Sequence, residues 1–195
     1  MARPRAFDEK AVLDAALNCF WSRGFEATSV RDLAQEMGIT GASLYNAFGD
    51  KRALYERAFA HFMASNLHER IARLERLAPM EAIERYFEEV VQRSLADEDR
   101  KGCMLVNSAL ELAPHDAKFA QLIDAELSRI EAFFRDCVER GQRDGSITRA
   151  DRPEDLARLL LSTLMGLRVL ARARPDPELL RGLLRPVFRM LRATP

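Results

Sequence analysis

Apolar residues recur at intervals of three and four along almost the whole chain, and this spacing restricts the fold more than any other feature. Such intervals place side chains on one face of an α-helix, whereas β-strands need strict alternation. Val12, Ala16, Cys19 and Phe20 show the helical spacing. Alternating segments are rare, so the sequence predicts an all-α fold. At 195 residues the chain can bury a sizeable core without disulfides.

The composition argues against several classes of protein. The chain carries 30 Lys and Arg and 30 Asp and Glu, so its formal net charge is zero. Proteins that coat nucleic acid or anionic membranes need uncompensated basic charge. No run approaches the roughly 20 apolar residues of a membrane span, and the N-terminus lacks the apolar core of a signal peptide. Three widely spaced cysteines without a CxxC pair indicate neither a disulfide framework nor a zinc site, and we expect a cytoplasmic protein.

Glycine, proline and charged turns divide the periodic segments into helices. Gly24 stands at the usual C-terminal glycine position of the first helix, and the turn Asp144-Gly145 closes a long one. The expected helices, in approximate residue numbers, are 9–22, two short ones before 50, one starting at 51, then 79–95, 102–113, 119–142, 154–171 and 177–191.

Residues 28–50 have the pattern of two short helices joined by a tight turn. Ser29 and Asp32 form a variant capping box at the start of the first. Gly38 allows a left-handed turn, and Thr40 can cap the second. In a helix-turn-helix unit the second helix enters the major groove of DNA, and its N-terminal residues face base edges. The pattern therefore indicates DNA binding, although a compact three-helix core without a DNA role would show similar spacing.

The second of these helices is unusual for a core element. Its early positions, Gly41 to Ser43, are small or polar, and its apolar residues Leu44 and Phe48 make only one four-residue interval. Small residues at the tip let a short helix enter a groove deeply. Tyr45 and Asn46 offer hydrogen-bond donors to phosphates or base edges.

The stretch from Ala16 to Phe59 resembles the DNA-binding domain of the TetR family of transcriptional repressors. The resemblance keeps one register over more than forty residues. Its matching residues are Phe20, Gly24-Phe25, Thr28-Ser29-Val30, Leu33-Ala34, Gly38-Ile39, Leu44-Tyr45, Phe48 and Lys51. Asn46 and Ala47 depart from it, because the family's tyrosine is usually followed by an aromatic residue or a histidine.

The resemblance implies roles for individual residues in DNA binding. The residues that it assigns to phosphates are Thr28, Ser29 with the amides at the start of its helix, Tyr45 and Lys51. The residues that it assigns to bases are Thr40, Ala42, Ser43 and Asn46. Arg31 is either a phosphate or base contact or a solvated residue paired with Asp32 or Gln35. Arg3 and Arg5 suit an arm that reaches the backbone or minor groove.

The last two helices carry wide apolar faces that exceed what one small core can cover. The leucines from Leu156 to Leu170 form one face, and those from Leu179 to Leu191 form the other. The resemblance implies that these helices form a four-helix bundle with a second subunit, so that a homodimer binds palindromic double-stranded DNA with half-sites roughly 34 to 36 Å apart. Four arginines between Arg181 and Arg192 leave open a basic amphipathic helix on a membrane surface.

We expect two domains. Residues 1–50 form the three-helix, helix-turn-helix DNA-binding domain, and residues 51–195 form a larger helical domain for effector binding and dimerisation. In the second domain, Asn107 and Phe133 or Phe134 are candidates to line an effector pocket. The histidines lack metal-ligand spacing, so we expect no metal and no cofactor.

Cys103 is the sharpest feature of the second domain. It follows Arg100 and Lys101 and is expected in the first turn of a helix, where helix amides and cations favour a reactive thiolate. A small buried core residue is the alternative. The segment from Gly102 to Leu112 also resembles a TetR subgroup that includes repressors of electrophile-detoxifying and copper-responsive genes. Cys19 and Cys137 lie within apolar helix faces and are expected to be structural.

Together these features predict a DNA-binding transcriptional regulator, a repressor by the family's habit, released by a small-molecule or thiol-reactive effector. A thiol-dependent helical enzyme that uses Cys103 is the main alternative, but the sequence offers no phosphate loop and no paired catalytic carboxylates.

Basic and acidic residues are also nearly balanced in the first 60 residues. The near-zero net charge therefore predicts that DNA binding relies on a few specifically positioned phosphate contacts, and that its affinity depends only modestly on salt concentration.

Overall fold

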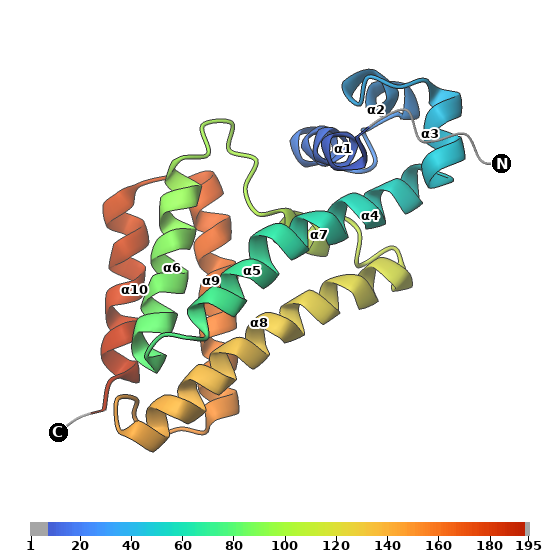
Figure 1. Cartoon of the computed structure of the whole chain (residues 1–195). Helices are drawn as coiled ribbons and strands as arrows, with labels where there is room; N and C mark the ends of the chain where they lie inside the picture. Colours follow the sequence, from blue (N-terminus) through green and yellow to red (C-terminus); the bar gives the residue numbers. More distant parts are fainter. Residues whose placement is uncertain (1–7, 194–195) are drawn as a thin grey trace. The chain divides into compact units, whose positions relative to one another are not determined.

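The structure is a computed structural model, and it describes residues 8–193. In this range all regular elements are helices, which confirms the expected all-α fold, and a single β-bridge joins Ile147 to Arg192. The helices are α1 (Glu9–Arg23), α2 (Val30–Glu36), α3 (Gly41–Phe48), α4 (Lys51–Met63), the π-helical turn η1 (Ala64–His68), α5 (Glu69–Leu74), α6 (Pro79–Leu95), α7 (Met104–Glu111), α8 (Ala117–Asp144), α9 (Pro153–Ala173) and α10 (Pro177–Leu191) (Figure 1).

Local sequence signals explain most of the helix starts. Asp and Ser/Thr side chains accept hydrogen bonds from the first amides of six helices, and proline occupies the first turn of three. The capping residues are Asp8, Ser29, Thr40, Asp50, Asp116 and Asp176, and the prolines are Pro79, Pro153 and Pro177. Gly24 and Gly145 end α1 and α8 with positive φ, as expected.

The chain divides into two compact units, with the boundary between His68 and Glu69. This boundary lies later than the expected one at residue 50. α4 belongs to the first unit because it packs along α1 with a buried face of Leu54, Ala58 and Phe59. The fourth helix thus completes the core of the first unit.

The core of the first unit is aromatic. The Phe20 and Tyr55 rings meet edge to face with centroids 5.0 Å apart, and Phe25 meets Tyr55 in the same way at 5.2 Å. Leu33 from α2 and Leu44 from α3 are completely buried. Edge-to-face rings and fully buried leucines fix helix positions well, so α2 and α3 are held on a rigid base.

The second unit is built around α6, α8, α9 and α10. α8 packs along α9 and also against α6, while α6, α9 and α10 lie side by side (Figure 1). Tyr86 and Phe87 of α6 meet Phe134 of α8 with ring centroids 5.2 and 5.6 Å apart. Phe133 and Phe134, expected beside an effector pocket, are 3% and 0% exposed, so these rings fill the interior.

The apolar faces of α9 and α10 are only partly used inside the unit. Leu160, Leu167 and Leu184 are buried. Large apolar side chains that stay exposed on these helices are Leu159, Val169, Leu183 and Met190. An exposed apolar strip along two adjacent helices is typical of an interface.

Three arginines in or directly after α10 are engaged with carboxylates. Arg181 lies 3.2 Å from Glu88 of α6, and Arg192 lies 2.7 Å from Glu84 of the same helix. Arg185 pairs with Glu178 within α10. These ion pairs offset much of the basic charge of this face and so disfavour the membrane-surface alternative. None of the helices within residues 8–193 is both long and apolar enough to cross a bilayer.

Candidate functional site

The expected capping box at the start of α2 is present. The Ser29 hydroxyl oxygen accepts a hydrogen bond from the Asp32 amide at 3.1 Å, and the Asp32 carboxylate accepts one from the Ser29 amide at 3.0 Å. Arg23 of α1 lies 2.9 Å from the same carboxylate. These contacts fix the first turn of α2, and they engage the Ser29 side chain within the protein.

The hydrogen bonds of the capping box predict a titration result. The Ser29 hydroxyl and amide, followed by Arg23, hold the pKa of Asp32 below its usual value. A lowered folded-state pKa contributes stability above the unfolded pKa of about 3.9, and this contribution is lost as the pH falls through the lower folded value. An NMR titration of Asp32 should therefore show a depressed midpoint, which Ser29→Ala moves back toward the usual value. Equal midpoints in both proteins would contradict the capping role.

The turn between α2 and α3 forms as the sequence predicts. Gly38 has φ +64°, a conformation that L-residues with side chains rarely adopt. The Ile39 amide donates to the Ala34 carbonyl at 3.0 Å. Thr40 then caps α3, since its hydroxyl accepts from the Ser43 amide at 3.1 Å and lies 2.9 Å from the Ser43 hydroxyl. The turn and the cap fix the direction in which α3 leaves α2.

α3 has one buried and one exposed side. Leu44 and Phe48 are buried against the unit, as the single four-residue interval implied. Ala42 and Asn46 are exposed, and their four-residue interval places them on one face of the helix. Tyr45, beside them, is 53% exposed. The small N-terminal turn and two polar side chains are thus available to a partner such as a DNA groove.

Lys51 has a structural role that the sequence did not indicate. Its ammonium donates to the Phe25 carbonyl at 2.9 Å and to the Thr28 carbonyl at 3.1 Å. It also lies 4.3 Å from the centroid of the Phe25 ring. An ammonium has three N–H donors, so a third remains for a phosphate. Lys51 therefore ties the start of α4 to the loop before α2.

Thr28 is located differently from the expectation. Its side chain is 0% exposed, and its hydroxyl donates to the Gly24 carbonyl at 2.6 Å. A buried hydroxyl with a short internal hydrogen bond does not fit the predicted phosphate contact. Thr28 instead stabilises the loop that Lys51 holds.

Arg31 is exposed on α2. One carboxylate that sequence reasoning offered it, Asp32, is engaged by Ser29 and by Arg23. The exposed position keeps Arg31 among the candidates for DNA contact. Arg3 and Arg5 lie outside the described residues.

Arg57 is a residue that the sequence analysis missed. It extends from α4, forms an ion pair with Glu9 of α1, and donates to the Ala47 carbonyl in α3 at 3.3 Å. Its guanidinium lies 4.8 Å from the centroid of the Phe48 ring. Arg57 thus links three helices and positions α3. Its partners are 10 and 48 residues away in the chain, so no local motif could reveal it.

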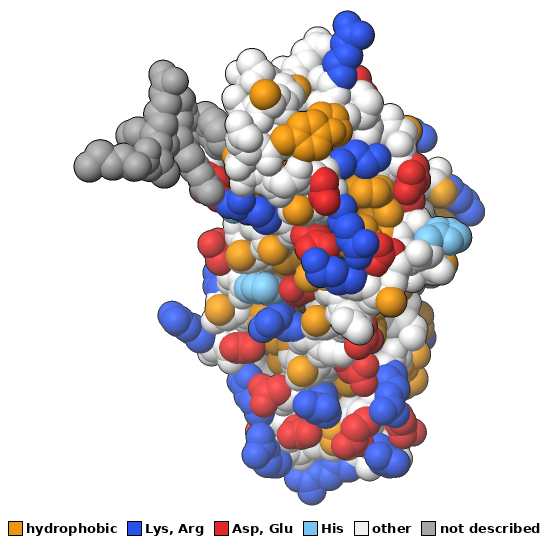
Figure 2. All heavy atoms as spheres, turned by 90° about the vertical axis from the view of Figure 1, so that its right-hand side faces the viewer, with side chains coloured by type: hydrophobic (Ala, Val, Ile, Leu, Met, Phe, Trp, Pro, Cys, Tyr) orange, Lys and Arg blue, Asp and Glu red, His pale blue; other side chains and the backbone are white. Residues whose placement is uncertain are grey.

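The charges on the surface are mixed. On the face shown in Figure 2, Lys and Arg side chains lie among Asp and Glu side chains instead of gathering in one patch. The balance of basic and acidic residues in the whole sequence is therefore also found on this face of the protein. A partner that is a polyanion would depend on individually placed contacts there.

In the second unit, Cys103 is the N-cap of α7, one residue before the first turn in which it was expected. It is half-buried and a free cysteine, and its side chain makes no capping hydrogen bond. The ammonium of Lys101 lies 3.2 Å from Asp99. Cys103 is therefore not a fully buried core residue, and it does not lie within the first turn of α7. It stands at the end of the connector between α6 and α7.

Asn107, the other expected sensing residue, is engaged at both ends of its amide. Its Nδ2 donates to the Lys101 carbonyl at 2.8 Å, and its Oδ1 accepts from Arg172 at 3.1 Å. These contacts hold the connector before Cys103. Cys19 and Cys137 are buried. Burial raises the pKa of the Cys19 thiol, and it raises the pKa of the Cys137 thiol to about 12.

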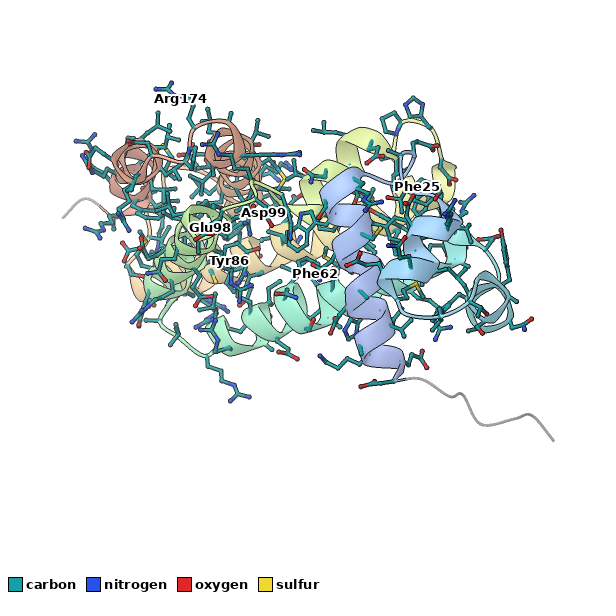
Figure 3. The ribbon with its side chains drawn as sticks, turned by 90° about the horizontal axis from the view of Figure 1, so that it is seen from above. Phe25, Phe62, Tyr86, Glu98, Asp99 and Arg174 are labelled. Carbon is teal, nitrogen blue, oxygen red and sulfur yellow. The ribbon has the colours of Figure 1, made fainter. Side chains whose placement is uncertain are left out.

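A buried polar cluster surrounds Tyr86 of α6. Arg70 of α5 is 6% exposed, and its guanidinium lies 5.4 Å from the ring centroid of Tyr86 and 3.4 Å from Glu89. Burial lowers the pKa of Arg70. Burial also raises the pKa of Tyr86; the charges of Arg70 and Arg168 oppose this second shift, and Cys103 adds to it. Tyr86 lies in the interior of this unit (Figure 3). The cluster brings the Arg70 guanidinium, the Tyr86 phenol and the Glu89 carboxylate together in the interior of the second unit.

Two short helices joined by a glycine turn, with a small and exposed tip on the second, define the helix-turn-helix class of bacterial transcriptional regulators. Residues 12–58 match the family model described as bacterial regulatory proteins, tetR family. Residues 79–187 match the model for the tetracyclin repressor-like C-terminal domain. The chain belongs to the TetR family of bacterial regulatory proteins.

Relatives align over most of the chain. The uncharacterised HTH-type transcriptional regulator YezE of Bacillus subtilis (strain 168) is 31% identical, over 91% of this chain and 93% of its own. The HTH-type transcriptional repressor ComR of Escherichia coli (strain K12) is 28% identical, over 87% and 82%. A cysteine mutant of the TetR family regulator CifR, solved with 26-base-pair operator DNA, has a TM-score of 0.85 at 33% identity and covers 96% of this chain and 98% of its own.

Proposed function

We propose that this protein is a transcriptional repressor that binds a palindromic operator through α3. The observation that carries the proposal is the exposed, small N-terminal turn of α3, with Ala42, Tyr45 and Asn46 on one accessible side. Thr40 and Ser43 flank this turn and offer hydroxyl groups. Base contacts would come from Thr40, Ala42, Ser43 and Asn46, and phosphate contacts from Tyr45, from Lys51 and from the amides at the start of α2.

We propose that the repressor is a homodimer. Its interface would be the apolar strip of α9 and α10, because Leu159, Val169, Leu183 and Met190 are exposed there without a cover in one chain. A two-fold dimer places two α3 helices about one turn of DNA apart, which matches a palindrome. A regulator that binds the bacterial chromosome acts in the cytoplasm.

The effector is proposed to act in the second unit at Cys103. The thiol is half-buried at the start of α7, so an electrophile can reach it and would find a sulfur nucleophile there. Modification would then favour a dimer state whose α3 helices no longer match the operator.

Regulation is proposed in preference to catalysis. A thiol enzyme needs a base that activates its nucleophile, and turnover needs a group that releases the product. The polar neighbour Asn107 instead uses both ends of its amide to hold the backbone. A helix-turn-helix unit would also be unexplained in an enzyme.

The test is a mobility shift on the DNA upstream of the protein's own gene, with and without an electrophile. We expect a sequence-specific complex that the electrophile dissociates, and that survives the electrophile in Cys103→Ser. A lack of any specific complex would contradict the repressor proposal. Dissociation of the Cys103→Ser complex at the wild-type dose would contradict only the thiol sensor.

A further inference from the structure

The connector from Asp97 to Cys103, here called the Cys103 segment, contains two residues with positive φ. Arg100 has φ +52°, the left-handed region that residues with side chains rarely adopt, and Gly102 has φ +77°. The Gly102 amide donates to the Asp97 carboxylate at 2.8 Å. A left-handed non-glycine residue persists only where surrounding contacts hold it.

Besides Asp97, those contacts come from Arg172, near the end of α9. Its Nε donates to the Arg100 carbonyl at 3.1 Å, and one terminal nitrogen donates to Asn107 Oδ1 at 3.1 Å. Asn107 in turn donates to the Lys101 carbonyl at 2.8 Å. The stem of Arg172 lies against Gly102 so closely that a Cβ there would be 2.8 Å from the arginine Cδ. One side chain therefore fixes three successive residues before Cys103.

This arrangement leaves little room for adjustment. The space between the end of α6, the Cys103 segment and α9 holds a cavity of about 10 Å³, enough for one water molecule. Arg100, Gly102 and Arg172 line this cavity, and Cys103 directly follows Gly102. If a group added to the Cys103 sulfur displaces the segment, the Arg172 contacts must stretch or break, because the arginine stem is packed against Gly102 and has little space to follow.

We propose that Arg172 is a positioning residue that holds the Cys103 segment and carries a change at Cys103 to α9. The proposal rests on the proposed function, because it explains how thiol modification reaches the helix that bears the exposed Leu159 and Val169. A planar guanidinium can serve two acceptors at fixed angles, whereas an ammonium cannot reproduce this fork. Small displacements of interface helices are a common way to switch an oligomer.

The experiment compares Arg172→Gln and Arg172→Lys with the wild type. Arg174→Gln is the matched control, because Arg174 is exposed two residues further on and its side chain extends away from the helices (Figure 3). Iodoacetamide is the probe. The Cys103 sulfur displaces iodide, gains one carboxamidomethyl group and loses its proton to the buffer. Peptide mass mapping verifies the site, since Cys19 and Cys137 are buried.

Two readouts decide the proposal. Hydrogen exchange of residues 97–107 should become about tenfold faster in Arg172→Gln, less so in Arg172→Lys, and stay unchanged in Arg174→Gln. Alkylation should weaken operator binding by about tenfold or more in the wild type and in Arg174→Gln, but by less than about threefold in Arg172→Gln.

The outcomes separate this proposal from the proposed function. Unchanged exchange in Arg172→Gln, or an alkylation effect equal to that of the wild type, would overturn the role of Arg172. If alkylation leaves wild-type operator binding unchanged, the thiol sensor and the transfer of its signal to α9 both fall. In that case the hydrogen-exchange data still test whether Arg172 positions the Cys103 segment.

Discussion

Replacing Ala42 with glutamate is expected to abolish operator binding without unfolding the protein. Ala42 is exposed in the first turn of α3, where a carboxylate is favourable to the helix because it faces the positive end of the helix dipole. The same carboxylate would enter the groove between two phosphate backbones and meet their charge. We expect the Kd for the operator to rise by at least about 100-fold, which corresponds to about 2.7 kcal/mol.

Fluorescence anisotropy with labelled operator measures this loss, and thermal unfolding checks the fold. Ala42→Gln is the matched control, because glutamine has the size and shape of glutamate without its charge. It should change sequence preference and weaken binding far less. Equal affinities for the glutamate and glutamine variants would show that position 42 lies outside the DNA interface.

Lys51→Ala is expected to damage the protein in two ways. The carbonyls of Phe25 and Thr28 lose their ammonium donor, which should lower the free energy of unfolding by about 1–3 kcal/mol. Binding to operator and to unrelated DNA should weaken together, and the slope of log K against log salt should fall by about one charge, because the third N–H no longer meets a phosphate.

Denaturant unfolding and binding at several salt concentrations test the two effects separately. Arg52→Ala is the control, since it removes a cation from the same helix turn, and Arg52 pairs with Glu56 one turn on instead of holding the loop before α2. A stability loss with an unchanged salt slope would make Lys51 purely structural. An unchanged stability would contradict the role of its two carbonyl contacts.

The helix-turn-helix unit could be predicted closely because its signals are local. The box of Ser29 and Asp32, the left-handed turn at Gly38 and the Thr40 cap each join residues within a few positions of one another. Short-range hydrogen bonds and allowed backbone angles depend on neighbouring residues, and the printed sequence displays these directly. The burial of Thr28 has the opposite origin, because it depends on the packing of residues that are distant in the sequence.

The domain boundary and the Cys103 segment depended on contacts between distant residues. α4 looks like the start of a second domain in sequence, but its apolar face closes the core of the first unit. The charged connector before Cys103 looks like a solvated loop, but Arg172 fixes it from a position 72 residues away. The spacing of apolar residues identifies the apolar face of a helix, but it does not show which other helix that face packs against.

The sequence by itself determined the all-helical class, most helix ends, the DNA-binding motif and the family resemblance, because these follow from spacing and from short-range capping. Only the tertiary structure decided that Lys51 and Arg57 fasten the helix-turn-helix unit and that Arg172 holds the segment before Cys103. Long cationic side chains can reach many acceptors, and folding selects among them by bringing distant backbone carbonyls within hydrogen-bonding distance.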